Sequence, residues 1–481
     1  MEKLKNKLSK GEILAFASGD LFGGGAQLII SFYYLIFLTD IVKIRPALAG
    51  FIVLFSKIWD AISDPLMGII TDNTRSKWGR RKPYFLIGFF SILASFFLLW
   101  LPISASSEIV RFLYMLFAYT LYSTVSTIVM VPYSAMSSEI SLDYKERNTV
   151  NGARLVFSQV SSLLCAVIPL EIVKAFSDVR SGYMAMAVAF GAFFAIPFLL
   201  IFLFTKERVP FDDQKSKFSL KLFLQPFKVK SFRYLIAIYL FAFLAMDIVS
   251  TVFAYYMNYY LKRPTELNFV LGAMLIVQVI MVPLVVSLAN KIGKAKVVMY
   301  SIIVWLVAIV FMALLQPSWG AWFIYANAVI MGLGIAGCVV MPWLMYPDVT
   351  DVGELAFGKR TAGSFSGIMT FMRKFSSALG IFIVSAMLDL SGYIKPYEDV
   401  IDGVTKEIMA EQPQSVLVML KIVVVVIPII LLAVTFFASL KYPLSQEVLE
   451  KIRGHLEFKK GNLELDPISE KEAEDIKKAV I

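Results

Sequence analysis

Twelve long apolar runs constrain this chain more than any other feature, because about 20 apolar residues are enough to cross the hydrocarbon core of a bilayer as a helix. Apolar residues make up 58% of the 481 residues and charged residues only 17%, unlike a soluble domain. We therefore expect an all-α polytopic membrane protein. The expected spans are residues 12–38, 46–71, 83–103, 109–136, 151–175, 181–205, 231–261, 267–289, 297–316, 319–347, 361–390 and 416–440.

Lysine and arginine are distributed unevenly between the two sides of these spans. The N-terminal segment, the alternate loops on the same side and the tail carry 31 of them, whereas the opposite loops carry 9. Because positively charged segments tend to remain in the cytoplasm, we expect both termini to be cytoplasmic. The net charge of +10 then reflects orientation, and we expect no nucleic-acid partner. A multi-pass protein of the plasma membrane, acting as a monomer in the lipid bilayer, is the expected setting.

The longest basic connection lies near the middle of the chain and divides the spans into two sets of six. Similar loops recur at nearly equal offsets: GRRKP begins at Gly79 and GKAKV at Gly293, and Arg147 and Arg360 each close a charged loop. Such offsets indicate parallel repeats that rock around a central site. The expected domains are a six-helix bundle over 1–205, a cytoplasmic linker over 206–230, a second bundle over 231–441 and a cytoplasmic tail over 442–481.

Charged residues inside span 2 are the main functional signal. Asp60 and Asp64 are one helical turn apart, and Lys57 precedes Asp60 by three residues, so all three share one helix face. A charge at this depth costs at least about 2.5–3.5 kcal/mol on insertion scales. With Ser63 between them, the two acids offer the oxygen ligands of a Na⁺ site or a place for a proton. Alternatively, Lys57 neutralises one acid and the other ends the helix before Pro65.

Other polar residues inside the spans are candidates for coupling or for substrate binding. Arg373 and Lys374 lie near the middle of span 11, where they either face the acidic pair across a central cavity or extend to the lipid headgroups. Asp247 in span 7 and Asp20 in span 1 are further buried acids. Span 4 carries Thr127 among several hydroxyl residues, which either complete a cation site or pack helices together.

Cofactor chemistry has little support in the composition. The two cysteines lie in apolar runs, and the single histidine, His455, lies in the tail, so no disulfide or metal framework is expected. No nucleotide-binding or hydrolase motif occurs. We therefore expect neither an enzyme nor a cofactor, and only Na⁺ or H⁺ as a coupling ion.

Three segments resemble one known transporter family. They are SKIWDAISDPLMGIITDNTRSKWGRRKPYFLIG (56–88), VPYSAMSSEISLDYKERN (131–148) and MRKFSSALG (372–380). These segments resemble the glycoside-pentoside-hexuronide:cation symporters, a branch of the major facilitator fold that includes the melibiose carriers. The resemblance implies a cation site at Asp60, Asp64, Ser63 and Thr127, a link between sugar and cation sites at Lys374, and a gating loop at Arg75, Arg80, Arg81 and Lys82.

The sequence departs from melibiose carriers where they place sugar-binding acids, because it has Gly24 and Met130 there. Asp20, one turn from Gly24, is a substitute, or the substrate is another glycoside, a pentoside or a uronide. The expected function is inward transport of such a sugar coupled to Na⁺ or H⁺. Lysophospholipid symporters share the cation site of this family, so an amphiphile transporter is the alternative. A third reading is a sensor that signals through its tail, although a charged and partly helical tail is by default solvated.

Overall fold

The structure is a computed structural model that describes residues 8–141, 144–207, 224–358, 362–401, 404–459 and 465–481. Twelve of its helices are long and apolar enough to span a membrane, which confirms the expected all-helical class and the number of spans. Pro65 lies inside the second of these helices, so the alternative in which the helix ends before Pro65 is wrong. Residues 208–223 of the expected linker, and Arg360 of the repeated loop, lie outside the described residues.

Two compact units, interleaved in sequence, make up the chain. Unit 1 takes residues from 1–218, 253–272 and 381–419, and unit 2 takes residues from 219–252, 273–380 and 420–481. This division follows spatial contacts, so the expected sequence halves at 1–205 and 231–441 stay a prediction about the repeats. Helices α10, α11, α14 and α15 contribute residues to both units.

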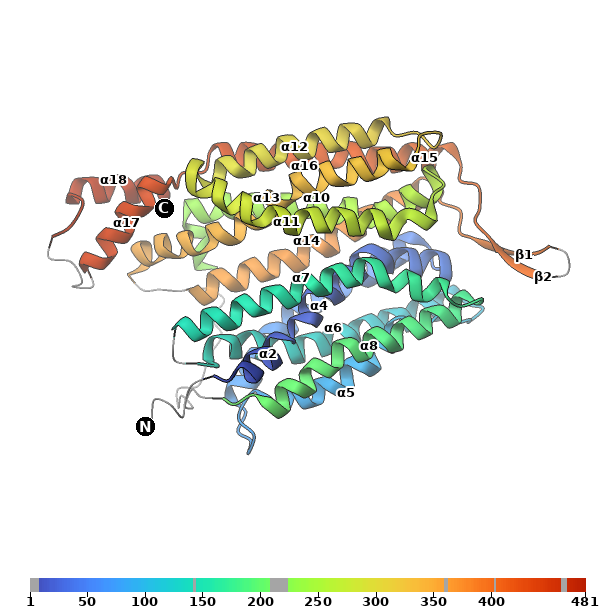
Figure 1. Cartoon of the computed structure of the whole chain (residues 1–481), viewed down its shortest axis with the longest axis horizontal. Helices are drawn as coiled ribbons and strands as arrows, with labels where there is room; N and C mark the ends of the chain where they lie inside the picture. The colour runs from blue at the N-terminus through green and yellow to red at the C-terminus, as the bar shows by residue number, and fades with distance from the viewer. Residues whose placement is uncertain (1–7, 142–143, 208–223, 359–361, 402–403, 460–464) are drawn as a thin grey trace. The chain divides into compact units, whose positions relative to one another are not determined.

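Unit 1 contains the first six spans, which Figure 1 shows in blue to green. Helix α5 packs against α8, α4 against α6, and α3 against α7. Local signals begin several helices: Ser9 and Asp178 accept backbone N–H bonds at the starts of α2 and α8. The helices are α2 (Lys10–Ala17), α3 (Asp20–Ile29), α4 (Pro46–Asn73), α5 (Lys82–Leu99), α6 (Glu108–Glu139), α7 (Tyr144–Lys174) and α8 (Val179–Phe204). The first span continues as π-helix over Ile30–Tyr34 and Phe37–Ile41.

The remaining helices belong to unit 2 or to both units, and α12 packs against α13 and α16. They are α10 (Lys230–Tyr255), α11 (Leu267–Ile292), α12 (Lys294–Leu314), α13 (Ala321–Phe357), α14 (Ala362–Leu390), α15 (Gln414–Lys421), α16 (Ile427–Leu440), α17 (Gln446–Lys459) and α18 (Glu470–Val480). π-Helical turns at Tyr256–Tyr260 and Ile422–Val426 continue α10 and join α15 to α16. Short 3₁₀ turns cover Gln225–Lys228 and Pro264–Glu266.

Two features differ from the sequence-based expectation. A short antiparallel hairpin, β1 (Tyr397–Ile401) with β2 (Val404–Ile408), lies in the loop between α14 and α15. The tail is not simply solvated, because Ile452 of α17 and Val480 of α18 are fully buried within unit 2. Apolar residues at helical spacing in a mostly charged segment cause this docking.

Close packing of α3 on α7 depends on small residues in span 1. A Cβ atom added to Gly24 would lie 2.6 Å from the backbone oxygen of Ser158, a distance that real Cβ atoms do not reach. The hydroxyl of Ser162 donates to the backbone oxygen of Gly24 over 3.3 Å. Small residues of this kind allow membrane helices to approach closely.

We predict that Gly24→Ala lowers the melting temperature of the purified protein, because the added methyl group forces α3 away from α7 at a cost of about 1–3 kcal/mol. The matched control is Gly152→Ala in α7, where an added Cβ meets nothing within 4 Å. This control should be neutral or slightly stabilising. Melting followed by intrinsic fluorescence compares the two, and equal melting temperatures would contradict the packing argument.

Candidate cation-binding site

Helices α4 and α6 pack against each other in unit 1 and bring the predicted acids to a row of hydroxyl groups. Asp60 and Asp64 lie one turn apart on α4, and both face α6. The positions of the hydroxyls on α6 follow the same helical spacing, because Ser123 and Thr127 are also one turn apart. The two carboxylates of α4 therefore lie opposite two hydroxyl groups of α6 at the interface between the helices.

Asp60 is almost completely buried, with 2% of its surface exposed. The Nζ atom of Lys57 lies 3.1 Å from one carboxylate oxygen, and the hydroxyl of Ser123 donates to the other. The ammonium group also lies 5.7 Å from the centre of the Tyr119 ring. The alternative that Lys57 neutralises one acid is therefore correct for Asp60.

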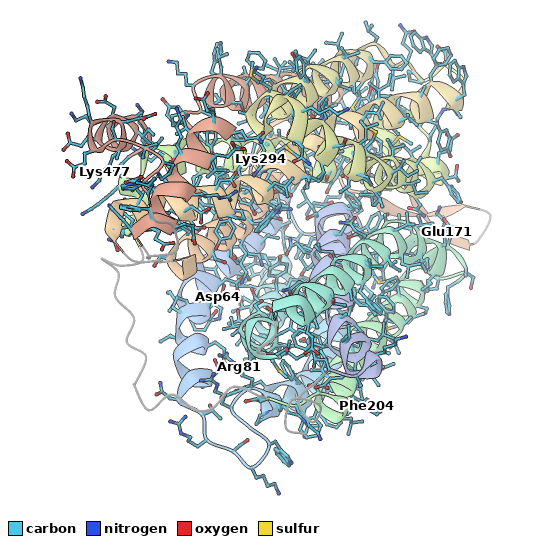
Figure 2. All side chains as sticks on the ribbon, turned by 60° about the vertical axis from the view of Figure 1, so that its left-hand side comes forward. Asp64, Arg81, Glu171, Phe204, Lys294 and Lys477 are labelled. Atoms are coloured by element: carbon cyan, nitrogen blue, oxygen red, sulfur yellow. The ribbon has the colours of Figure 1, made fainter. Side chains whose placement is uncertain are left out.

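Asp64 (labelled in Figure 2) accepts a hydrogen bond of 2.7 Å from the hydroxyl of Thr127. The hydroxyl of Ser63 lies 3.4 Å from the same Thr127 oxygen. The four predicted residues of the cation site thus occur together, and Ser123 adds a fifth oxygen donor. Lys57, Asp60 and Asp64 sum to a charge of minus one, which a single Na⁺ or H⁺ would balance.

The donor set limits which ion fits. Among the described residues there is no cluster of three or more histidine, cysteine, aspartate or glutamate side chains that could hold a metal ion. Two carboxylates with hydroxyl groups are instead hard oxygen ligands, which suit an alkali cation or a proton better than a transition metal.

In unit 2, the buried Asp247 forms a separate ion pair with Arg373, whose side chain is 25% exposed. Two guanidinium nitrogens of Arg373 lie 2.6 and 3.0 Å from the two carboxylate oxygens of Asp247. Ser376 donates to the same carboxylate over 3.0 Å, and the Arg373 guanidinium lies 4.7 Å from the centre of the Phe243 ring. Arg373 is therefore engaged by Asp247, whereas the coupling role expected for its neighbour Lys374 stays a prediction.

Asp20 also has a cationic partner, which the sequence analysis missed. The Nε atom of Arg154 in α7 lies 2.5 Å from Asp20, and the hydroxyl of Tyr133 in α6 donates to the same oxygen over 3.0 Å. The Arg154 guanidinium also lies 4.6 Å from the centre of the Tyr133 ring. The sequence does show a charged residue, Arg154, inside an expected span. Because Arg154 is 134 residues from Asp20, the sequence alone does not reveal that the two residues pair.

Backbone N–H groups of the basic loop between α4 and α5 donate hydrogen bonds to the carboxylate of Glu207. The N–H groups of Arg80, Arg81 and Lys82 donate to Glu207 over 3.0, 2.8 and 3.0 Å. Arg81 (Figure 2) is 3% exposed, and Lys82 also donates to the backbone oxygen of Thr205. Glu207 thereby fixes the start of α5, while the expected gating role of this loop, including Arg75, stays a prediction.

Another buried acid, Asp40, lies two residues beyond the expected end of span 1 and was not singled out in the sequence analysis. It is 5% exposed and accepts hydrogen bonds of 2.6 Å from the hydroxyls of Tyr259 and Tyr393, all within unit 1. Burial, followed by the charge of Asp40, raises the pKa of Tyr393 well above its usual value, so this phenol remains a donor. These contacts connect segments far apart in sequence, which no local pattern reveals.

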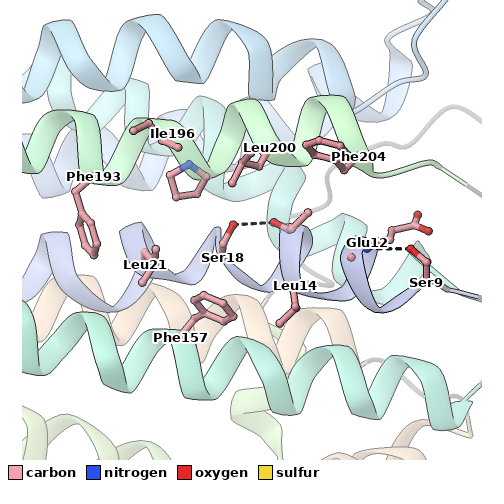
Figure 3. A pocket seen from close by; sticks show the side chains of 13 residues that line it. Ser9, Glu12, Leu14, Ser18, Leu21, Phe157, Phe193, Ile196, Leu200 and Phe204 are labelled. Atoms are coloured by element: carbon pink, nitrogen blue, oxygen red, sulfur yellow. Dashed lines mark hydrogen bonds between the residues drawn. The ribbon is translucent and has the colours of Figure 1, made fainter.

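An apolar groove of about 620 Å³ lies between α2, α7 and α8 in unit 1. Figure 3 shows Leu14, Phe157 and Leu200 along its walls, with Ser9 and Glu12 near one end. Along α2 and the start of α3 the lining extends from Ser9 to Leu21, or about 18 Å at 1.5 Å per residue. That length is close to the depth of one leaflet, half of a core of about 30 Å.

The family follows from comparison with known proteins. Residues 15–446 match the family described as MFS/sugar transport protein. The chain belongs to this family. An inward-facing, unoccupied bacterial homologue of the human lysosomal transporter Spinster covers 92% of this chain and all of its own, with a TM-score of 0.63 and 14% identity. At that identity the likeness shows the fold alone. The expected relation to melibiose carriers in particular stays a prediction.

Three curated relatives are transporters by name. An uncharacterised symporter of Synechocystis is 26% identical over 93% of this chain and 97% of its own length. A sodium-dependent lysophosphatidylcholine symporter of Xenopus tropicalis is 25% identical over 92% and 89%. An isoprimeverose transporter of Lactiplantibacillus pentosus is 24% identical over 81% and 82%. These relatives are transporters and not enzymes.

We predict that Asp247→Ala and Arg373→Ala each destabilise the protein. Arg373→Ala leaves the buried carboxylate of Asp247 without its partner, at a cost of about 3–5 kcal/mol, and Asp247→Ala costs less because Arg373 is partly exposed. The double variant should melt at a higher temperature than either single variant, since it removes both charges. A double-mutant cycle on melting temperatures measures the coupling. Strictly additive losses would show that the bidentate pair contributes no coupling to stability.

Proposed function

We propose that this protein is a secondary active symporter that moves a small sugar inward together with Na⁺ or H⁺. The observation that carries the proposal is the pair of acids on α4, Asp60 and Asp64, with hydroxyl donors from α6 inside two membrane spans. The free energy of inserting such acids into a membrane is unfavourable, and intramembrane acids are by default interpreted as functional. The protein works as a monomer in the plasma membrane, with the coupling ion as its sole cofactor.

Cation binding and substrate binding are coupled because both depend on the same equilibrium between conformations. A cation bound at Asp60 and Asp64 favours the outward-open, substrate-ready state, and occupancy by both ligands permits the change of access. If the cation tightens substrate binding, the substrate must tighten cation binding by the same factor. Lys57 reduces the formal charge of the empty site to minus one. Binding of one monovalent cation then makes the site neutral.

A sugar substrate is supported by the family match and by a polar cluster in unit 1. The isoprimeverose transporter carries a sugar according to its name. Asp20, Arg154 and Tyr133 together offer charged and phenolic groups of the kind that bind sugar hydroxyls. We propose that this cluster takes part in substrate binding in place of the melibiose-carrier acids, with Lys374 linking substrate and cation.

We predict that Asp60→Asn and Asp64→Asn each abolish cation-driven accumulation of substrate, because an amide cannot supply the negative charge that holds a cation. Thr127→Ala should weaken the cation dependence without abolishing it, since one oxygen donor is lost. Uptake into membrane vesicles under an imposed sodium or proton gradient measures both effects. The control is Ser126→Ala on the same helix, which should behave as wild type. Unchanged accumulation in both aspartate variants would refute the site.

An amphiphile transporter is the second candidate, and the apolar groove beside α2 favours it. The groove is polar near one end and apolar along a length close to one leaflet, which suits a single acyl chain. A relative is named as a lysophosphatidylcholine symporter. The cation site at Asp60 and Asp64 would serve either substrate in the same way.

Uptake in the same vesicles distinguishes the two candidates. A panel of labelled glycosides, pentosides, uronides and lysophosphatidylcholine should show gradient-driven uptake of a sugar, and Leu200→Trp, which fills the groove, should leave that uptake intact. Uptake of lysophosphatidylcholine alone, lost in Leu200→Trp, would establish the second candidate and exclude the first. The matched control is Leu203→Trp, at an exposed position on α8 outside the groove lining.

A further inference from the structure

The related loops at Gly79 and Gly293 lead into α5, which begins at Lys82, and into α12, which begins at Lys294. Gly79 has a φ of 108° and Gly293 a φ of 92°, both in the left-handed region that favours glycine. The N–H groups of the first residues of a helix have no acceptor within the helix. The three residues after each glycine present backbone donors at or just before a helix start, where the partial positive charge of the helix favours an anion.

The first copy is occupied by an acid from the chain itself. Glu207, the third residue after the end of α8, accepts from the N–H groups of Arg80, Arg81 and Lys82. A Cβ atom at Gly79 would lie 2.6 Å from this carboxylate, so the anion sits directly against the glycine. This arrangement shows what the loop geometry binds when an anion is available.

The second copy has the same donors but lacks the acid. In the described part of the chain, the N–H groups of Lys294, Ala295 and Lys296 have no hydrogen-bond acceptor. The third residue after the end of α16 is Pro443, in the place that Glu207 takes after α8. A Cβ atom at Gly293 would meet nothing within 4 Å. The space that the carboxylate fills in the first copy is therefore open in the second.

A cavity of about 680 Å³ occupies this place within unit 2, next to Lys294 (labelled in Figure 2). Lys291 and Lys296 line it and are exposed, and neither has an ion pair with any residue that the structure describes. Tyr442 also lines the cavity, and its buried hydroxyl has no hydrogen-bond partner among the described residues. Burial, with a smaller effect of Asp348, raises the pKa of Tyr442, so its phenol is a donor.

The acidic residues around the cavity are already engaged by other groups. Asp348 lies 2.5 Å from Lys294 and 3.2 Å from Arg453. Glu447 pairs with Lys451 over 3.0 Å. Glu450 accepts from a neighbouring side-chain amide over 3.2 Å. The lining of the cavity thus includes backbone donors, two lysines and a phenol, while its carboxylates are engaged by other groups.

We propose that a phosphate group binds in this cavity, at the start of α12, in the position that Glu207 holds at the start of α5. Three amides, two ammonium groups and one hydroxyl exceed what a carboxylate can accept, whereas a phosphate offers more acceptor oxygens and more charge. The phosphate belongs either to the headgroup of a phospholipid at the predicted cytoplasmic face or to a soluble phosphate compound. The proposal is independent of the transported substrate.

Direct binding to the purified full-length chain tests the proposal. Inorganic phosphate is titrated by calorimetry, and retention of phosphatidylglycerol from mixed phosphatidylglycerol and phosphatidylcholine nanodiscs is measured by mass spectrometry. The wild type should bind at least one of these probes saturably. Binding of inorganic phosphate would identify a soluble ligand, and retention of phosphatidylglycerol without phosphate binding would identify a lipid. Binding of neither probe would overturn the proposal.

Two variants and a control locate the site. Pro443→Glu places a carboxylate at the position equivalent to Glu207, so binding should be lost. Lys291→Ala combined with Lys296→Ala should weaken binding roughly tenfold or more, since charge-assisted hydrogen bonds are removed. Lys441→Ala, an exposed lysine outside the lining, should bind as wild type. If Pro443→Glu does not fold, the lysine pair decides, and wild-type affinity in the folded variants would place the anion elsewhere.

Discussion

The cost of placing charge in hydrocarbon controls how the spans of this protein pair. A charged side chain at the bilayer centre costs at least about 2.5–3.5 kcal/mol on insertion scales, so each acid in a span requires a partner from a neighbouring helix or turn. Such partners join α4 to α6, α3 to α7 and α10 to α14. The pairs are Asp60 with Lys57 and Ser123, Asp64 with Thr127, Asp20 with Arg154, and Asp247 with Arg373.

These clusters differ in charge balance, and the difference separates structural from functional chemistry. Asp247 and Arg373 neutralise each other with two matched hydrogen bonds, which leaves no need for an ion. Within α4 as the structure describes it, Lys57 pairs with Asp60 only and Asp64 is a second acid, so the formal charges of this group sum to an excess negative charge. The site where the helices gather more acid than base is the natural place for a mobile cation.

The sequence predicted the elements whose signal is local. The positions of the twelve spans and the i,i+4 spacing of Asp60 and Asp64 follow from periodicity and composition within a single helix, and the structure agrees with them. The partners of Asp20 and Asp40 were missed because Arg154, Tyr259 and Tyr393 are more than 100 residues away. Helix packing alone brings such residues together, and one sequence does not specify it.

Repetition in the sequence proved informative where the two copies differ. The loops at Gly79 and Gly293 were recognised as related from their spacing, and both adopt the left-handed glycine conformation. The loss of the acid equivalent to Glu207 becomes meaningful only when the hydrogen bonds of the first copy are known. The proposed phosphate site at the start of α12 rests on this difference between the two loops.

The most direct measurement of the central claim is infrared difference spectroscopy of the purified protein, which records carboxylate bands as Na⁺ is added at constant pH and as pH is lowered without Na⁺. If Asp60 and Asp64 bind the coupling ion, one of the two titrations changes carboxylate bands saturably, and the change disappears in the Asp60→Asn/Asp64→Asn double variant. Identical difference spectra for the wild type and the double variant would contradict a cation site on α4.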